Sequence, residues 1–321
     1  MRLLTIVPPN TKIDFVGKRR IAFAFSLTLM LVSIGTFAFQ GLNFGIDFRG
    51  GILIEISTHG PANIPEIRRN LGALNLGDVQ IQQFGAPNDV LIRVQQQEGD
   101  DSAQQRAVTA IKQTLGDSVA EYRRTETVGP TVGGELIRAA IIAVTLALAA
   151  ILVYVWFRFE WQFGVGAVVA LTHDVIATIG LFAVTQMEFN LATVAAVLTI
   201  AGYSINDTVV IYDRVREELR RYKKMPLVDL LNLSTNRTLS RTFLTSFTTL
   251  LALFALVLLG GPIIRGFSLA MIFGIVVGTY SSVFIAVPAL LLLNLGRQTF
   301  SGDDTPPQDS DAAAQANASD D

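Results

Sequence analysis

Six long apolar stretches constrain this chain more than any other feature of its sequence. A helix that crosses about 30 Å of hydrocarbon needs roughly 20 mostly apolar residues. Six stretches reach this length, and we predict six transmembrane helices at residues 21–40, 136–157, 162–184, 191–212, 241–259 and 267–295. The first is too long for the apolar region of a cleaved signal peptide, and no small-residue cleavage site follows it.

Composition supports a membrane protein. Only 16% of the residues are charged, whereas soluble domains carry about 25%. This excludes an ordinary soluble enzyme. The sequence has no cysteine, which excludes disulfides and thiolate chemistry.

Basic residues near the span ends predict the orientation. Lys18, Arg19 and Arg20 precede the first span, and a basic loop is expected at residues 213–240. With six spans both segments lie on one side, the cytoplasm, so both termini (residues 1–20 and 298–321) are expected there. The basic loop either sets the topology alone or also docks a cytoplasmic partner or anionic lipid. The tail is acidic and poor in large apolar residues, which predicts disorder.

A small folded domain is predicted at residues 41–135, on the periplasmic side. Strand-like segments occur at 51–57, 78–84, 89–95 and 118–128, and helical periodicity at 61–74 and 101–115. The resulting order, β-α-β-β-α-β, is the ferredoxin-like arrangement. This segment contains no nucleophile–base pair and no metal-ligand spacing, so we expect it to bind a partner and to catalyse nothing. We expect no cofactor and no enzymatic activity for the chain.

Ionisable residues inside the predicted spans are the main functional candidates, because they are energetically unfavourable in a bilayer. They are His173 and Asp174 in the third span, Asp207 in the fourth, and Arg241 at the start of the fifth. The polar residues expected to support them are Tyr203, Ser204, Asn206 and Thr208 around Asp207, and Thr245, Thr248 and Thr249 after Arg241. Both polar faces should point into the bundle rather than at lipid.

Asp207 and Arg241 lie at comparable predicted depths, so they are positioned to pair. Burial raises the pKa of a carboxyl group and a nearby arginine lowers it, and a group balanced in this way can relay protons. The alternative is a static ion pair that fixes the helix register. His173 and Asp174 leave the same two alternatives open. Gly274 and Gly278 form a G-x-x-x-G pattern typical of close helix packing.

Several runs of residues resemble the SecD/SecF family of protein-export membrane proteins. NFGIDFRGG at residues 43–51 resembles a family signature, and AGYSINDTVVIYDRVRE at 201–217 is similar to the fourth-span signature of its SecF branch. NRTLSRT at 236–242, GGP at 260–262 and GFS at 266–268 continue the match in order. The similarity extends over about residues 12–297 and excludes the acidic tail.

This resemblance implies an auxiliary subunit of the Sec preprotein translocase in the resistance-nodulation-division superfamily. Such a subunit pairs with SecD, acts with the SecYEG channel after SecA, and uses the proton motive force, or sodium in some members, to complete export of an unfolded preprotein. Its functional carboxylate and arginine correspond to Asp207 and Arg241, which favours the relay. The expected location is the bacterial inner membrane, or a thylakoid membrane in a photosynthetic source, in contact with lipid and not with nucleic acid.

Two other function classes remain as alternatives. One is a small-molecule exporter of related fold, although this chain carries only one six-span half and one small outer domain. The other is a purely structural channel subunit without ion coupling.

The glycine-rich signature also has two interpretations. Gly45, Gly50 and Gly51 permit positive φ angles and close backbone approach, and Asp47 and Arg49 are near enough in sequence to pair. The segment is expected to be a structural hinge, or simply a tight connection between helix and domain.

Overall fold

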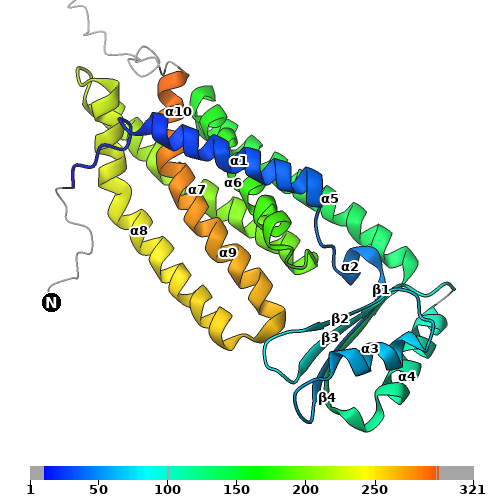
Figure 1. The fold of residues 1–321 in the computed structure, drawn as a ribbon. Coiled ribbons are helices and arrows are strands. Elements are labelled where there is room, and N and C mark those ends of the chain that lie inside the picture. The colour runs from blue at the N-terminus through cyan, green and yellow to red at the C-terminus, as the bar shows by residue number, and fades with distance from the viewer. Residues whose placement is uncertain (1–10, 100, 294, 296–321) are drawn as a thin grey trace, which may run out of the picture.

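Helices dominate the computed structural model, which describes residues 11–99, 101–293 and 295. Within that part of the chain, six helices are long and apolar enough to cross a membrane. They are α1 (Arg19–Gln40), α5 (Pro130–Arg158), α6 (Trp161–Thr185), α7 (Leu191–Arg221), α8 (Leu227–Leu259) and α9 (Gly261–Ser281), the last of which continues through η2 (Ser282–Ala286) into α10 (Val287–Leu292) (Figure 1). The prediction of six long apolar helices is therefore confirmed.

Two of these helices extend well past the predicted spans. The expected basic loop at 213–240 is helical except between Arg221 and Leu227. Leu219, Leu230 and Leu231 are buried, so apolar residues at helical spacing hold both extensions against the bundle. The predicted acidic tail at 298–321 lies outside the described residues.

Helices α9 and α7 pack closely against each other. A Cβ atom added at Gly274 would overlap the side chain of Ile200, and one added at Gly278 would lie 3.1 Å from Cβ of Ser204. The two glycines are thus what lets these helices approach, as the G-x-x-x-G pattern predicted. One turn further on, η2 is a π-helical segment that ends just before Pro288. Proline cannot donate to the preceding turn, which accounts for the irregularity there.

The small domain follows α1 and contains the element order β-α-β-β-α-β that was predicted. Its members are β1 (Gly51–Thr58), α3 (Ile64–Gly72), β2 (Val79–Gln83), β3 (Asp89–Val94), α4 (Asp101–Leu115), the 3-10 turn η1 (Gly116–Ser118) and β4 (Val119–Val128). The strands form one sheet in the order β2-β3-β1-β4, and all three neighbouring pairs are antiparallel.

Alternation along β1 divides the sheet into two faces. Ile52, Ile54 and Ile56 are fully buried and share a core with Ile67 of α3 and Ile111 of α4. The intervening residues of β1 point to the other face, because successive side chains in a strand alternate. Figure 1 shows both helices on one side of the sheet, with the bundle beyond its other side.

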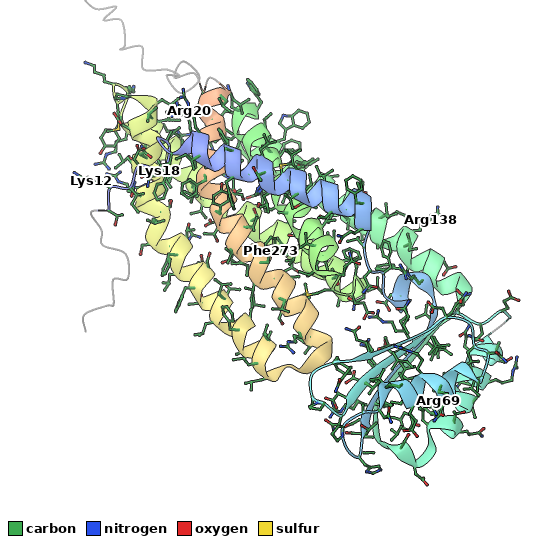
Figure 2. The ribbon with its side chains drawn as sticks, viewed as in Figure 1. Lys12, Lys18, Arg20, Arg69, Arg138 and Phe273 are labelled. Atoms are coloured by element: carbon green, nitrogen blue, oxygen red, sulfur yellow. The ribbon has the colours of Figure 1, made fainter. Side chains whose placement is uncertain are left out.

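The basic N-terminal residues and this domain lie at opposite ends of the molecule. Figure 2 places Lys12, Lys18 and Arg20 at the end of the bundle remote from the sheet, whereas Arg69 lies on the domain itself. A bundle that crossed a membrane would therefore carry the basic N-terminal residues on one side and the small domain on the other.

Candidate functional site

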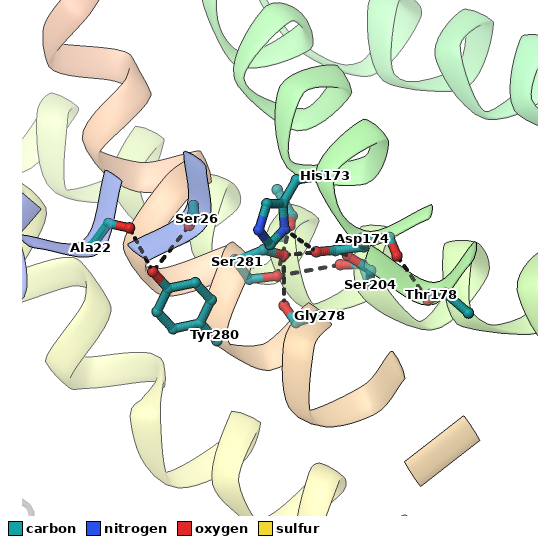
Figure 3. Close-up of polar contacts among 11 residues, drawn as sticks. Ala22, Ser26, His173, Asp174, Thr178, Ser204, Gly278, Tyr280 and Ser281 are labelled. Atoms are coloured by element: carbon teal, nitrogen blue, oxygen red, sulfur yellow. Dashed lines mark hydrogen bonds and ion pairs between the residues drawn. The ribbon is translucent and has the colours of Figure 1, made fainter. Parts of the chain in front are cut away.

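Asp174 lies at the centre of a buried hydrogen-bond network that joins three helices. Its side chain is completely inaccessible to solvent. Ser204 of α7 donates to its Oδ2 at 2.5 Å and Ser281 of α9 donates to the same atom at 2.6 Å (Figure 3). Because a buried carboxylate without partners is strongly unfavourable, this network fixes α6, α7 and α9 together.

His173 completes this cluster, and it contacts its neighbour directly. Its Nδ1 lies 2.9 Å from Oδ1 of Asp174, although adjacent helical residues point about 100° apart. Its Nε2 is buried and has no hydrogen-bond partner within the described part of the chain. The ring lies near Tyr280, whose hydroxyl donates to the Ala22 carbonyl and hydrogen bonds with Ser26 of α1 (Figure 3).

Asp207, one turn after Ser204 on α7, forms a second buried site. Thr242 of α8 donates to Oδ1 of Asp207 at 2.6 Å, and the side chain is only 7% exposed. The other oxygen, Oδ2, is buried and has no hydrogen-bond partner among the described residues. Only one oxygen of this carboxylate is therefore held in place by a hydrogen bond within the described chain.

A series of hydroxyl groups connects the surroundings of the two carboxylates. Thr208, next to Asp207, hydrogen bonds with Ser282 at 2.8 Å, and Ser282 donates to the backbone oxygen of Ser204 at 3.4 Å. Ser204 in turn binds Asp174. Both carboxylates are thus linked through a single turn of α7 and the start of the π-helical segment.

Arg241 lies near Asp207 but is not joined to it by an ion pair. It precedes Thr242 on α8, and its side chain is exposed. Among the described residues, the hydrogen bond to Asp207 comes from the next residue, Thr242. The direct pair that the sequence allowed is absent from this conformation.

The buried polar face of α8 differs from the expected one. Its buried members are Ser234, Thr235, Thr238, Thr242 and Ser246. Arg241, Thr245 and Thr248 are exposed, and Thr249 is half-buried. Thr245 donates to the Arg241 carbonyl of its own helix. A threonine that bonds within its helix is tolerated on an outward face, so hydroxyl content alone did not identify the buried face.

The expected polar face of α7 is partly correct. Ser204 and Thr208 are buried in the networks described above, and the Tyr203 hydroxyl donates to Ser246 at 3.3 Å. Asn206, in contrast, is exposed. It lies on the helix face opposite to the buried residues, because it is two positions from Ser204 and two from Thr208.

The glycine-rich signature forms a turn and the short helix α2 (Ile46–Arg49) between α1 and β1. Gly50 and Gly51 have φ angles of +71° and +116°, and a Cβ at Gly51 would lie 2.5 Å from the Val94 carbonyl oxygen. Asp47 does not pair with Arg49 here. It accepts a hydrogen bond at 2.9 Å from the backbone N–H of Leu191, the first residue of α7. The sequence alone gave no signal for that contact.

No group of three or more His, Asp or Glu residues arranged to hold a metal ion occurs in the described part of the chain. The site is therefore made of two single carboxylates, hydroxyl groups and one imidazole. Such groups can bind a proton or a small cation, and they can change helix contacts when they do so.

Comparison with known proteins places these residues in a family context. Residues 100–296 match the family model described as protein export membrane protein SecD/SecF, C-terminal, and residues 35–62 match the SecD/SecF GG motif. A protein translocase subunit SecF from Rickettsia bellii is 46% identical over 292 residues, covering 90% of this chain and 96% of that protein. One from Magnetococcus marinus is 49% identical over 290 residues, covering 89% and 93%.

Solved structures give the same result. The crystal structure of SecDF from Thermus thermophilus, a translocon-associated membrane protein, has a TM-score of 0.80 at 36% identity and covers 91% of this chain. A super-membrane-facing form of SecDF has a TM-score of 0.65 at 35% identity and covers 90%. The chain spans only 39% and 40% of those two longer chains.

Proposed function

Because the chain belongs to the SecD/SecF family of protein-export membrane proteins, we propose that it is an auxiliary subunit of the protein translocase. In this role it uses the proton motive force to complete export after SecA has driven translocation through SecYEG. It acts on the unfolded preprotein without being an enzyme itself. Sodium ions are the alternative driving ion.

The observation that carries this proposal is the burial and incomplete hydrogen bonding of the Asp207 carboxylate. Its carboxylate is buried within a span, one oxygen is held by Thr242, and the other has no partner in the described chain. An ionisable group at such a position is unfavourable and is expected to be functional. Moving one elementary charge through 100 mV supplies about 2.3 kcal/mol, which is enough to shift a two-state equilibrium by more than tenfold.

Arg241 is proposed to act together with Asp207. It is exposed on the described chain, yet a guanidinium facing lipid within a span is unfavourable. We infer that a second membrane subunit covers this face of α8, which includes Thr245 and Thr248. The two SecDF structures, in which this chain matches about two fifths of a longer one, support SecD as that subunit.

Asp174 and His173 are proposed to be the inner part of the same ion-coupling system. A change in the charge of Asp174 would alter its bonds to Ser204 and Ser281, and so the packing of α7 against α9. Because Ser204 lies one turn from Asp207 on α7, a shift of this helix changes the surroundings of both carboxylates.

The small domain is proposed to be a ferredoxin-like unit on the periplasmic side, with both chain termini in the cytoplasm and the bundle in the bacterial inner membrane. The strand order and antiparallel pairing support that fold. The basic residues at the opposite end of the bundle support that orientation (Figure 2). Gly50 and Gly51 are proposed to form the tight connection between span and domain.

The proposal is tested in cells that depend on this chain for secretion. We expect Asp207→Asn to assemble with SecD, judged by copurification, and to fail to support secretion of a periplasmic reporter. Asp117→Asn, an identical change on the exposed surface of the small domain, is the matched control. Normal secretion with Asp207→Asn would favour a purely structural subunit, and saturable flux of a small molecule through the purified protein would favour an exporter.

A further inference from the structure

Two segments far apart in the sequence are joined at the outer end of the bundle. Residues 43–47 lead from α1 into the small domain, and residues 186–191 lead from α6 into α7. Together we call them the clasp. Phe44 and Phe189 form a parallel β-bridge, with the Gly45 N–H donating to the Phe189 carbonyl at 2.9 Å and the Phe189 N–H donating to the Asn43 carbonyl at 2.8 Å.

Side chains strengthen the clasp on both sides of this bridge. The Asn43 amide donates to the Gln186 carbonyl at 2.9 Å, and Asp47 accepts from the N–H of Leu191 at 2.9 Å. Arg93 of β3 forms an ion pair with Glu188, so the sheet itself is attached. A Cβ added at Gly45 would overlap the carboxylate end of Glu188 and would lie 3.2 Å from Cβ of Asn190, so a larger residue at that position would require Glu188 to move.

An aromatic cluster supports the same junction. Phe44 and Phe48 each pack against Phe189, with ring centroids 6.0 Å apart in both pairs, and Phe182 packs against Phe189 at 5.5 Å. The clasp is therefore held by backbone, side-chain and apolar contacts together.

The contact from Asp47 is not needed to form α7. Asn190 caps that helix because its side chain accepts from the N–H of Thr193, and Oγ1 of Thr193 accepts from the N–H of Asn190 in turn. Asp47 comes from the other segment and places its carboxylate at the positive end of the α7 dipole. Its contribution is to join the small domain to α7.

α7 is the helix that carries Asp207. Asp207 lies sixteen residues from Leu191, about 24 Å along the helix axis. A continuous helix transmits a shift along its axis over that distance. A displacement of α7 caused by the ion at Asp207 would therefore reach the clasp, and the clasp would carry it to β1 and β3.

We propose that Asp47 is a positioning residue that links the helix bearing Asp207 to the small domain, so that ion movement is transmitted outward. This inference rests on the proposed function. It gives the glycine-rich signature a role beyond a tight turn, because Gly45 permits the close approach and Asp47 fixes it. The clasp stays closed through the cycle and transmits motion as a rigid connection.

The first test compares Asp47→Ala, which removes the acceptor, with Asp47→Asn, which keeps an acceptor oxygen without the charge. In the complex with SecD in lipid nanodiscs, we expect amide exchange at Leu191 to rise about tenfold in Asp47→Ala, because a charged hydrogen bond is lost. Asp47→Asn should give a smaller rise, and the control Asp117→Asn none. Unchanged exchange at Leu191 in Asp47→Ala would overturn the proposal.

The same variants are then compared in export with and without a proton gradient. We expect Asp47→Ala to lose most of the stimulation by the gradient while keeping the wild-type rate without it, and Asp47→Asn to lose less. Full stimulation in Asp47→Ala would overturn the proposal. Asp207→Asn is measured in the same assay. If it keeps full stimulation, the proposed ion-coupling function is wrong. The link between Asp47 and α7 is then judged by amide exchange at Leu191 alone.

A reversible cross-link tests whether the connection is rigid. The chain has no cysteine, so Phe44→Cys with Phe189→Cys provides a single disulfide across the bridge, where paired backbones lie close enough for that bond. Oxidation should restore gradient stimulation in the Asp47→Ala background, and reduction should remove it again. Loss of stimulation on oxidation of the otherwise wild-type pair would show that the clasp must open, which contradicts the proposal.

Discussion

Close packing of α7 against α9 predicts how much a glycine-to-alanine change will destabilise the protein. The loss of stability should grow as the space for the added Cβ shrinks. Gly274 has three atoms of the Ile200 side chain within 3.0 Å of the position that a Cβ would take. Ile200 is 1% exposed, so neighbouring groups surround its side chain. Gly274→Ala therefore forces the helices apart or Ile200 out of its rotamer, and overpacking of this kind costs about 1–3 kcal/mol.

Two further glycines calibrate this prediction. A Cβ at Gly278 would lie 3.1 Å from Cβ of Ser204, so Gly278→Ala should cost less, roughly 1 kcal/mol. A Cβ at Gly35 of α1 would meet nothing within 4 Å, so Gly35→Ala should stay within about 0.5 kcal/mol of wild type.

The assay is thermal unfolding of the complex with SecD in nanodiscs. With about 2–4 °C per kcal/mol for a chain of this size, Gly274→Ala should lower the apparent Tm by roughly 2–12 °C. Gly278→Ala should be intermediate and Gly35→Ala near zero. Equal Tm values for Gly274→Ala and Gly35→Ala would refute the reasoning that this glycine pair sets the distance between α7 and α9.

Two other predictions concern single side chains. Thr242→Val removes the only hydrogen bond to the Asp207 carboxylate in the described chain. Gradient-stimulated export should therefore fall at least tenfold, and Thr242→Ser should keep it. Thr199→Val, on the exposed face of α7, is the control, and no difference between Thr242→Val and Thr199→Val would contradict the role given to this bond. Glu55 lies outside the spans, and burial raises the pKa of its carboxyl group against the opposing charges of Arg123 and Arg124. The folded domain therefore favours protonated Glu55, so its contribution to stability is full below the ordinary value of 4.5 and is lost as the pH rises above it. Protection factors of β1 amides should fall as the pH rises above 4.5 in wild type and fall less in Glu55→Gln. Equal slopes in both proteins would refute this assignment.

The sequence predicted the architecture well because the signals for it are local. Twenty-residue apolar runs define spans, β-branched residues indicate β1, and turn residues separate the strands. The G-x-x-x-G pattern of Gly274 and Gly278 predicted close packing, although its partners Ile200 and Ser204 were not identifiable. The short helix α2 was missed, since four residues carry no periodicity.

The site was harder to predict because its contacts join distant segments. Asp174, Asp207 and His173 stood out as ionisable groups in apolar runs. That Ser281 binds Asp174 and Thr242 binds Asp207 depends on how three helices are rotated against each other. On α8, Thr242 and Thr245 are equally polar in sequence, and only packing decides that the first is buried and the second exposed. The contact from Asp47 to Leu191 spans 144 residues and has no local signature.

The central claim is that ion movement at Asp207 drives the late stage of export. The most direct measurement uses proteoliposomes that contain this chain with SecD, SecYEG and SecA. The rate of the late, ATP-independent step is followed with and without a proton gradient, for wild type and for Asp207→Asn. We predict that the gradient accelerates the wild type and leaves Asp207→Asn unchanged, and acceleration by sodium alone would keep the mechanism and change the ion. Equal acceleration of both proteins by the proton gradient would contradict the claim and make Asp207 a structural residue.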